Sequence, residues 1–309
     1  EMTFCVTDHR RTHMFARKKW HSLKNQVPDY LEYCSACGQS ARTVEGKRGS
    51  IGQFLRWCEA SGLRNSEQVT PEVLEAYRHH LASFRQQRKQ RPLDIATQRN
   101  RLTAVRLWFR YLRRWGFLKT DPAAEIELPR VGRRLPKGFL THGEIERILK
   151  AIPPDSAIAL RDRAIVETYY ATGIRRMELA NLDIEDVDLL TGMVQVNQGK
   201  GGKDRRIPIA PRSCEWIERY LDRARPNFAR ADSGRALYLD SKGFRFRGHQ
   251  LTKLVADHIR KAGVRQSGSC HLFRHSLATL MHENGADIRY IQEMLGDDQG
   301  PSQTPSSSG

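Results

Sequence analysis

The sequence has no run of 18 or more apolar residues, which excludes an ordinary transmembrane helix. Its N-terminal residues lack the basic, apolar and small-residue order of a secretory signal peptide. Cysteine is scarce, with 6 in 309 residues, and this number favours reduced thiols over a disulfide framework. We therefore expect a cytoplasmic protein with no membrane partner.

Acidic residues are too few to balance the basic ones. The chain has 52 Lys and Arg against 35 Asp and Glu, a formal net charge of +17 and a pI of about 9.9. An excess spread along the whole chain favours a nucleic-acid partner, with a merely soluble basic protein or a binder of acidic lipid as alternatives. The length is sufficient for two domains, each with its own core.

The first half of the chain is predicted to be helical. Apolar residues recur there at helical spacing, between capping residues and glycines. The expected helices cover about residues 28–36, from 43 past 58, from Thr70-Pro71 past Leu81, and about 97–115.

Four arginines follow one face of the last of these helices, because their spacings are seven, four and three residues. They are Arg99, Arg106, Arg110 and Arg113. Such a strip can contact successive phosphates and displace their counterions, which positions a duplex without reading its sequence. The alternative is a solvated face, but the absence of acids from the strip favours DNA contact.

Cys34 and Cys37 have the spacing of a zinc-binding pair, with Cys5, His9 and His13 as further possible ligands. The spacing between these groups is irregular, and the cysteine pair falls within an expected helix. We therefore expect a buried or idle thiol pair and no metal.

A Pro- and Gly-rich basic stretch at residues 126–139 predicts an extended linker between two domains. Thr141 and Glu144 then form a capping box that begins a new helix. Two β-prone runs, 193–197 and 205–209, flank a basic Gly-rich tip and predict a hairpin. Further helices are expected from about 161 to 172, from Arg175 onward, and after His271.

Three motifs of this half carry residues that can act on a phosphodiester. Arg175 follows a Thr-Gly-Ile turn at a helix start, where amide donors and a guanidinium can meet one anion. Lys200 stands between two glycines at the hairpin tip and can enter a DNA groove. His271 and Arg274, three residues apart, are expected on one side of a helical turn. Each motif alone is weak, because exposed basic residues are common in such places.

The combination resembles the tyrosine recombinase family of phage integrases and Xer-like recombinases. The pattern is Thr-Gly-Ile-Arg-x-x-Glu-Leu, a hairpin with Gly-Lys-Gly, and His-x-x-Arg-His, and the resemblance covers about residues 27–296. It implies a mainly α fold with a small antiparallel β-sheet, built as a two-domain clamp around duplex DNA. The expected divisions are a basic N-terminal extension (1–26), a helical SAM-like core-binding domain (27–125), the linker (126–139), a catalytic domain (140–297) and a disordered tail (298–309).

The resemblance also implies a role for each site residue. Arg175 and Arg274 would grip the scissile phosphate and neutralise charge in the transition state, and Glu178 would orient Arg175. Lys200 would protonate the 5′-oxygen leaving group, with His271 assisting, and Lys203 at the same tip is a further candidate DNA contact. In the family a tyrosine attacks phosphorus and forms a 3′-phosphotyrosine link, so no metal, ATP or other cofactor is required.

Two departures from the family pattern lie near the C-terminus. Leu295-Gly296 matches a Leu-Gly-His turn, but the next residue is Asp297, and its carboxylate would repel a phosphate. No tyrosine follows Tyr290, which precedes the turn on an expected helix with Ile288 and Ile291, where it packs or lies at the surface. We therefore expect the nucleophile to be absent and cleavage to be deficient.

The expected partners are double-stranded DNA and further copies of the chain. The family forms a tetramer on DNA, and we expect this assembly to be impaired here. The expected location is the bacterial cytoplasm, with binding at the nucleoid. One alternative is a non-catalytic DNA-binding relic that competes for recombination sites. Another is a type IB topoisomerase-like enzyme, which the compact core-binding region disfavours. The residues do not reveal the target sequence, nor whether the protein integrates, excises or resolves dimers.

Overall fold

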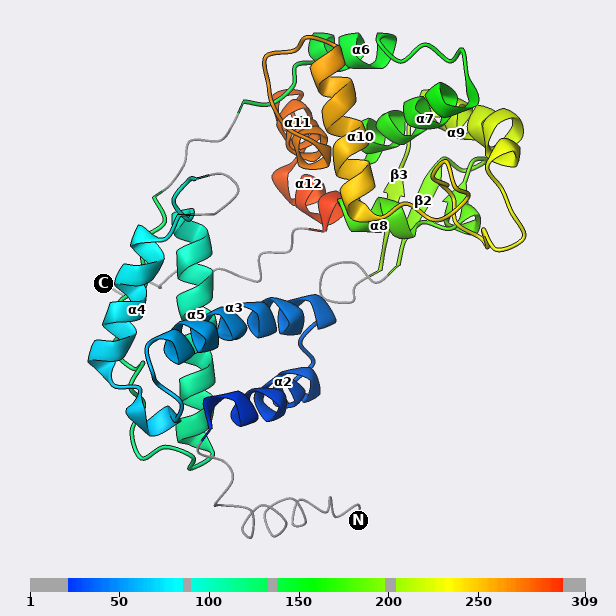
Figure 1. Cartoon of the computed structure of the whole chain (residues 1–309). Coiled ribbons are helices and arrows are strands. Elements are labelled where there is room, and N and C mark those ends of the chain that lie inside the picture. The colour runs from blue at the N-terminus through cyan, green and yellow to red at the C-terminus, as the bar shows by residue number, and fades with distance from the viewer. Residues whose placement is uncertain (1–21, 86–89, 133–137, 198–203, 297–309) are drawn as a thin grey trace, which may run out of the picture. The chain divides into compact units, whose positions relative to one another are not determined.

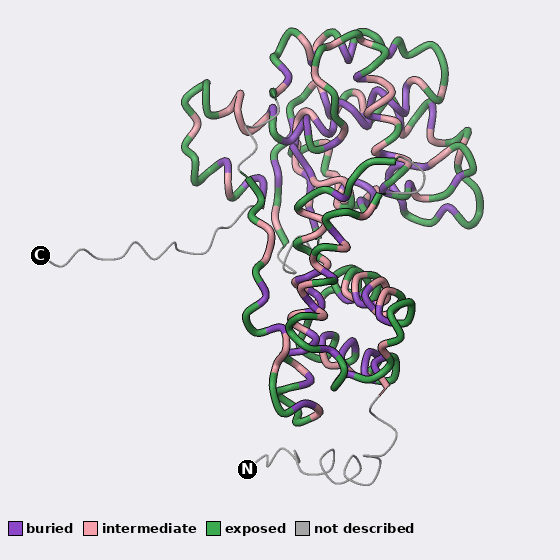
Figure 2. Tube along the Cα trace, turned by 60° about the vertical axis from the view of Figure 1, so that its left-hand side comes forward, coloured by how far each residue is buried: buried purple, intermediate pink, exposed green. Residues whose placement is uncertain are grey.

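The computed structural model describes residues 22–85, 90–132, 138–197 and 204–296. The chain divides into two compact units, unit 1 (residues 1–134) and unit 2 (residues 135–309), each with its own buried core. Figure 1 labels their helices and strands, and Figure 2 shows that the buried residues lie inside each unit. In the described segments, no helix is both long enough and apolar enough to cross a membrane.

Unit 1 is helical, as expected. Its elements are η1 (Leu23–Gln26), α2 (Val27–Ala36), α3 (Ala41–Ala60), η2 (Ser66–Gln68), α4 (Pro71–Ser83) and α5 (Ile95–Arg114).

Capping residues explain where these helices begin. Thr70 accepts a hydrogen bond from the Val73 backbone N–H at 3.4 Å, which confirms the predicted start of α4. Ser40 accepts from the Thr43 N–H, and Asp94 accepts from the Ala96 N–H. Because these caps precede the first apolar positions, α3 and α5 each begin two residues earlier than predicted.

The core of unit 1 is rich in aromatic side chains from α3, α4 and α5. The Phe54 ring lies 4.9 Å from the ring of Tyr77 and 6.0 Å from that of Phe109, both in edge-on geometry. Trp108 is fully buried beside them. Edge-to-face rings stabilise a core beyond their buried area, so this cluster fixes α5 against its neighbours.

The cysteine pair lies at the end of α2. Cys34 is buried and accepts a hydrogen bond from Lys47 Nζ at 3.3 Å, whereas Cys37 is exposed. In the parts that the structure describes, no group of three or more metal-ligating side chains occurs. Cys5, His9 and His13 lie outside those parts.

Unit 2 combines helices with one small sheet. Its helices are α6 (His142–Lys150), α7 (Ala157–Thr172), α8 (Arg176–Asn181), η3 (Ile184–Asp186), α9 (Pro211–Arg219), η4 (Tyr220–Ala224), η5 (Arg225–Asn227), α10 (Gly248–Lys261), α11 (Cys270–Glu283) and α12 (Ile288–Leu295). Its strands are β1 (Val187–Asp188), β2 (Met193–Val196) and β3 (Arg205–Pro208).

The sheet is antiparallel in the order β1-β2-β3, and Val194 pairs with Ile207 in the β2–β3 hairpin. The hairpin was predicted, whereas the two-residue strand β1 was not. Together with the helices, the sheet confirms the predicted mainly α fold with a small antiparallel β-sheet.

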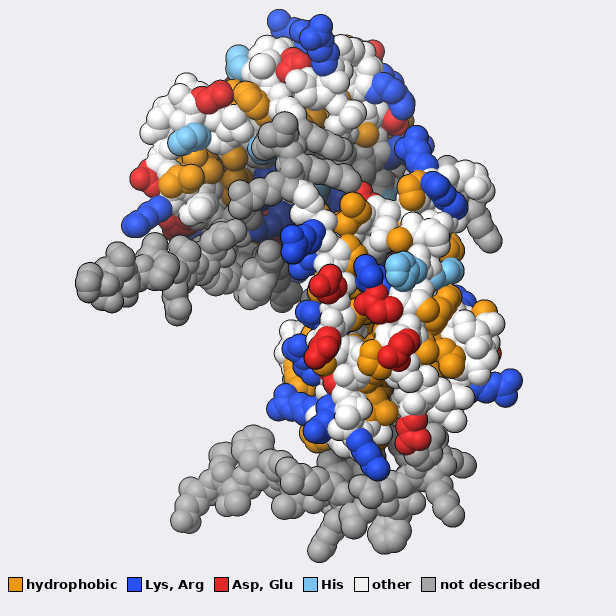
Figure 3. Space-filling model, turned by 90° about the vertical axis from the view of Figure 1, so that its left-hand side faces the viewer, with side chains coloured by type: hydrophobic (Ala, Val, Ile, Leu, Met, Phe, Trp, Pro, Cys, Tyr) orange, Lys and Arg blue, Asp and Glu red, His pale blue; other side chains and the backbone are white. Residues whose placement is uncertain are grey.

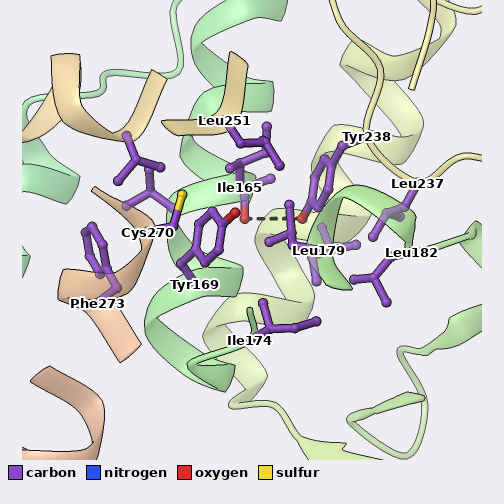
Figure 4. Packing of buried hydrophobic residues seen from close by; sticks show 14 of the residues in the cluster. Ile165, Tyr169, Ile174, Leu179, Leu182, Leu237, Tyr238, Leu251, Cys270 and Phe273 are labelled. Atoms are coloured by element: carbon purple, nitrogen blue, oxygen red, sulfur yellow. Dashed lines mark hydrogen bonds between the residues drawn. The ribbon is translucent and has the colours of Figure 1, made fainter. Parts of the chain in front are cut away.

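Helix α7 lies at the centre of unit 2 and is buried over most of its length. Figure 4 shows Ile165 and Tyr169 of this helix packed among Leu179, Tyr238 and Phe273, which come from distant segments. The helix begins at Ala157, four residues before the predicted start, because Ser156 accepts from the Ala159 N–H. Its C-terminal end at Thr172 carries the first functional motif.

Candidate active site

The turn after α7 brings the motifs of Arg175 and Arg274 together with the Leu295-Gly296 turn. Gly173 has a φ of +57°, a backbone conformation that favours glycine. A Cβ atom at this position would stand 2.7 Å from Leu295 Cδ2, 3.0 Å from Leu277 Cδ2 and 3.6 Å from Arg274 Cα. The turn therefore packs directly on α11 and α12, and it leads to Arg175, the N-cap residue of α8.

Arg175 is tied to α8 and to the end of α12. Its backbone N–H donates to Glu178 Oε2 at 2.9 Å, and its Nη1 donates to Glu178 Oε1 at 2.9 Å. Its Nη2 donates to the Gly296 carbonyl. These bonds fix the guanidinium plane of a side chain that is 19% exposed.

Arg274 is buried in α11 and reaches the same place from the other side of the turn. Its Nη1 donates to the Gly173 carbonyl at 3.0 Å, and its Nη2 donates to the Leu295 carbonyl at 2.7 Å. Arg175 and Arg274 therefore donate to the carbonyls of two adjacent residues. The structure thus brings together two arginines that lie 99 positions apart in the sequence, by subtraction of their numbers.

His271 departs from the prediction. Helix α11 begins at Cys270, so His271 lies in its first turn rather than before the helix. His271 is exposed whereas Arg274 is buried. A three-residue spacing separates two positions by about 60° around a helix, so the residues are neighbours, with Arg274 in the core and His271 at its margin.

Arg205, the first residue of β3, is a site residue that the sequence reasoning missed. Its Nη1 and Nη2 donate to the two carboxylate oxygens of Glu178, at 2.9 and 2.7 Å, and its Nε donates to the Met294 carbonyl at 3.0 Å. A Cβ atom on Gly296 would stand 3.2 Å from the Arg205 guanidinium. The only sequence signal that could have indicated Arg205 is its position, four residues after the Gly-Lys-Gly motif.

Glu178 accepts hydrogen bonds from both arginines and is itself almost buried, with its side chain 8% exposed. Burial alone would raise the pKa of Glu178. The hydrogen bonds from Arg205 and Arg175 outweigh this effect and lower the pKa to about 2. The carboxylate is therefore ionised throughout the physiological range and anchors both guanidinium groups.

Comparison with known proteins identifies the family. Residues 138–299 match the Phage integrase family. The tyrosine recombinase XerC 2 of Ralstonia nicotianae is 38% identical over 274 residues, covering 89% of this chain and 78% of the relative. The tyrosine recombinase XerD of Lacticaseibacillus casei is 32% identical over 280 residues, covering 87% and 89%. The chain belongs to the tyrosine recombinases, which break and rejoin DNA in site-specific recombination.

Solved structures agree with the fold of this recombinase. A lambda integrase (75-356) dimer bound to a COC′ core site superposes with a TM-score of 0.67 at 17% identity, covering 90% of this chain and 96% of that one. The XerH recombinase bound to difH in a pre-cleavage complex gives a TM-score of 0.66 at 21% identity, covering 88% and 78%. At these identities the likeness shows a shared fold.

Several predicted site residues lie outside the part of the recombinase that the structure describes. They are Lys200 and Lys203 at the hairpin tip, and Asp297 after the Leu-Gly turn. Tyr290 is described, and it is 50% exposed on α12, where Ile291 is buried. The expected position of Tyr290 on a helix before the turn is therefore confirmed, and its side chain lies at the surface.

The arginine strip of α5 forms a second candidate surface, a DNA interface. Arg99, Arg110 and Arg113 are exposed, and Arg99 Nη1 donates to the Pro129 carbonyl at 3.0 Å. Arg106 is half-buried, and its Nε is shielded from solvent with no hydrogen-bond partner in the structure. Figure 3 shows Lys and Arg side chains on the visible face of both units, with acidic side chains among them. Contact between the strip and DNA remains a prediction.

Proposed function

We propose that this recombinase binds duplex DNA and grips one phosphodiester with Arg175 and Arg274. The observation that carries the proposal is the convergence of the two guanidinium groups on the carbonyls of Leu295 and Gly296. A guanidinium held in a fixed plane can present parallel N–H donors to a phosphate with little further loss of side-chain freedom. Two such groups would neutralise charge that develops on the phosphoryl oxygens.

We assign the remaining roles by the family pattern. Lys200 would protonate the 5′-oxygen leaving group, with His271 at the exposed start of α11 assisting. The hairpin that carries Lys200 is anchored through Arg205, which contacts Glu178 on α8. Lys203 would contact the DNA backbone, and neither metal nor cofactor would take part.

We further propose that the 309-residue chain binds DNA without cleaving it. Residues 291–309 contain no tyrosine, and Asp297 stands where the family has a hydrogen-bond donor. Tyr290 is a poor substitute, because it lies half-exposed on α12, before the turn that the arginines contact. The same observation favours a second function, in which the chain occupies recombination sites as a competitor.

DNA would be held by both units. The helical core-binding domain (27–125) would contribute the α5 strip of Arg99, Arg106, Arg110 and Arg113, and the catalytic domain (140–297) would contribute the phosphate site. A lambda integrase tetramer bound to a Holliday junction shares the fold, with a TM-score of 0.69 at 17% identity, over 99% of this chain and 86% of that one. This likeness supports a homo-oligomer on DNA, whose assembly we propose is weakened.

The test uses a duplex that the protein selects from a random-sequence pool, prepared with and without a nick. We expect a shifted band in a native gel and no covalent adduct in a denaturing gel. Arg274→Gln should weaken the shift. Fusion of the C-terminal segment of a Xer relative after Gly296 should restore an adduct if the phosphate site is intact. An adduct that Tyr290→Phe abolishes would contradict our proposal for the nucleophile.

A further inference from the structure

Arg205 links three elements that carry the proposed phosphate site. It belongs to β3, it donates to both oxygens of Glu178 on α8, and its Nε donates to the carbonyl of Met294 on α12. Its side chain is 11% exposed, so these contacts are shielded from solvent. A charge-assisted pair with two parallel hydrogen bonds fixes direction as well as distance.

The charges around Glu178 explain why a second arginine is needed there. Glu178 carries one negative charge, and Arg175 alone would cancel it. With Arg205 present, the three residues retain a net charge of +1, which is the sum of two guanidinium groups and one carboxylate. The surplus charge can act on a phosphate because the groups are largely buried and weakly screened by solvent.

We propose that Arg205 is a positioning residue that neutralises Glu178 and thereby leaves the charge of Arg175 available to a DNA phosphate. The inference rests on the proposed phosphate site and adds a residue that acts on it indirectly. Arg205 also fixes the end of α12 at Met294. The carbonyls of the next two residues, Leu295 and Gly296, accept hydrogen bonds from Arg274 and Arg175. One side chain therefore sets both the charge and the orientation of the phosphate-gripping pair.

Without Arg205, the carboxylate of Glu178 would be left to Arg175 alone. Arg175 would still donate to this carboxylate through its backbone N–H and its Nη1, so the two residues would form a neutral pair. The Arg205→Lys variant would keep the charge but not the planar set of N–H donors. An ammonium group cannot donate to both carboxylate oxygens and to the Met294 carbonyl in the same geometry.

Arg206 provides a matched control. It follows Arg205 in the same strand, so its side chain points to the opposite face of the sheet, and it is exposed. Arg206→Gln and Arg205→Gln remove the same charge from adjacent positions. Only Arg205→Gln removes the contacts to Glu178 and Met294.

The test measures binding of inorganic phosphate through the NMR signals of the Arg175 and Arg274 Nε–H groups, with unfolding by denaturant as a check on folding. We expect Arg205→Gln to weaken phosphate binding about tenfold, the effect of losing charge-assisted hydrogen bonds. Arg206→Gln should change binding by less than about twofold, and Arg205→Lys should lie between them.

The double variant Glu178→Gln/Arg205→Gln decides the mechanism. If Arg205 acts by neutralising Glu178, removal of both should restore binding to within about threefold of Glu178→Gln alone. Binding in the double variant as weak as in Arg205→Gln would overturn the inference, and so would equal binding in Arg205→Gln and Arg206→Gln. If phosphate leaves both signals unchanged in the unaltered protein, the proposed phosphate site is contradicted, and so is the role of Arg205 that depends on it.

Discussion

The arginines at the site of unit 2 and those on α5 of unit 1 carry the same charge in opposite surroundings. Arg274 is buried and Arg205 is largely buried, and they donate to a carboxylate or to backbone carbonyls, whereas Arg110 and Arg113 are exposed. A buried charge requires partners because desolvation is costly, so its position becomes fixed. An exposed charge is solvated and screened, and it can act on a polyanion through number rather than exact position.

This difference predicts how substitutions will divide. Changes in the packed surroundings of the unit 2 site should affect stability and phosphate contact together, because the same bonds serve both. Changes on the α5 strip should affect DNA affinity alone. A substitution on the α5 strip that unfolds unit 1 would contradict this expectation. So would a substitution at the unit 2 site that leaves the free energy of unfolding unchanged.

The largest effect is expected from Gly173→Ala. The substitution forces a non-glycine residue to a φ of +57° and places a methyl group 2.7 Å from Leu295 Cδ2. We expect a loss of roughly 3–5 kcal/mol in the free energy of unfolding, from left-handed strain and overpacking together. Denaturant unfolding measures it.

Gly116→Ala is the control in unit 1. Gly116 has a φ of +76°, but nothing lies within 4 Å of the position of its Cβ. Only the backbone strain remains, so the loss should be about 1 kcal/mol. Equal losses for the two variants would show that the close packing of the turn on α12 does not stabilise unit 2.

The next effect is a pH dependence that Glu178 should produce. Its pKa is lowered from an ordinary value of 4.5 to about 2, so its ionised form stabilises the folded state by roughly 3 kcal/mol at neutral pH. This stability is present above the unfolded pKa and is lost as the pH falls through the folded pKa. The difference in unfolding free energy between the unaltered protein and Glu178→Gln should therefore shrink between pH 4.5 and about 2.

An exposed ion pair on α3 supplies the comparison. Glu45 contacts Arg48, and their side chains are 72% and 57% exposed. Glu45→Gln should change the unfolding free energy by less than about 0.5 kcal/mol, since solvent screens such pairs. A pH-independent difference for Glu178→Gln would contradict the assigned role of its carboxylate.

A smaller effect is expected on the α5 strip. Arg110→Gln should reduce the slope of log affinity against log salt by about 1, because one phosphate contact is lost. The unfolding free energy should stay within about 0.5 kcal/mol, because Arg110 is exposed. Lys119→Gln, an exposed substitution beyond the end of α5, is the control. An unchanged slope for Arg110→Gln would remove Arg110 from the interface.

The smallest effect is expected from Tyr290→Phe. Its hydroxyl is at the surface, so the unfolding free energy should change by less than about 0.5 kcal/mol, with DNA affinity unchanged. Tyr238→Phe makes the same chemical change in the core, where the hydroxyl lies 2.7 Å from Thr168 Oγ1. It should cost about 1–2 kcal/mol. A similar cost at Tyr290 would reveal a structural role that its exposure does not suggest.

Local signals in the sequence account for much of the fold. Capping residues and apolar spacing predicted α4, α5, α6 and the β2–β3 hairpin, because each signal involves residues within one or two turns of each other. Helix starts at Ala41, Ile95 and Ala157 were placed two to four residues late, since the caps stand outside the apolar pattern. Strand β1 was not predicted, because two residues are too few to show the alternation of apolar and polar residues that marks a strand.

The sequence by itself determined the family and predicted Arg175 and Arg274 as the phosphate-binding pair, since motif order needs no coordinates. Tertiary structure decided that Arg205 contacts Glu178 and Met294, 27 and 89 positions away, and that His271 is exposed where Arg274 is buried. It also decided that Gly173 lies against Leu295. The physical reason is that periodicity specifies which face of an element is apolar, whereas the partner of a buried charge depends on which distant element packs against that face.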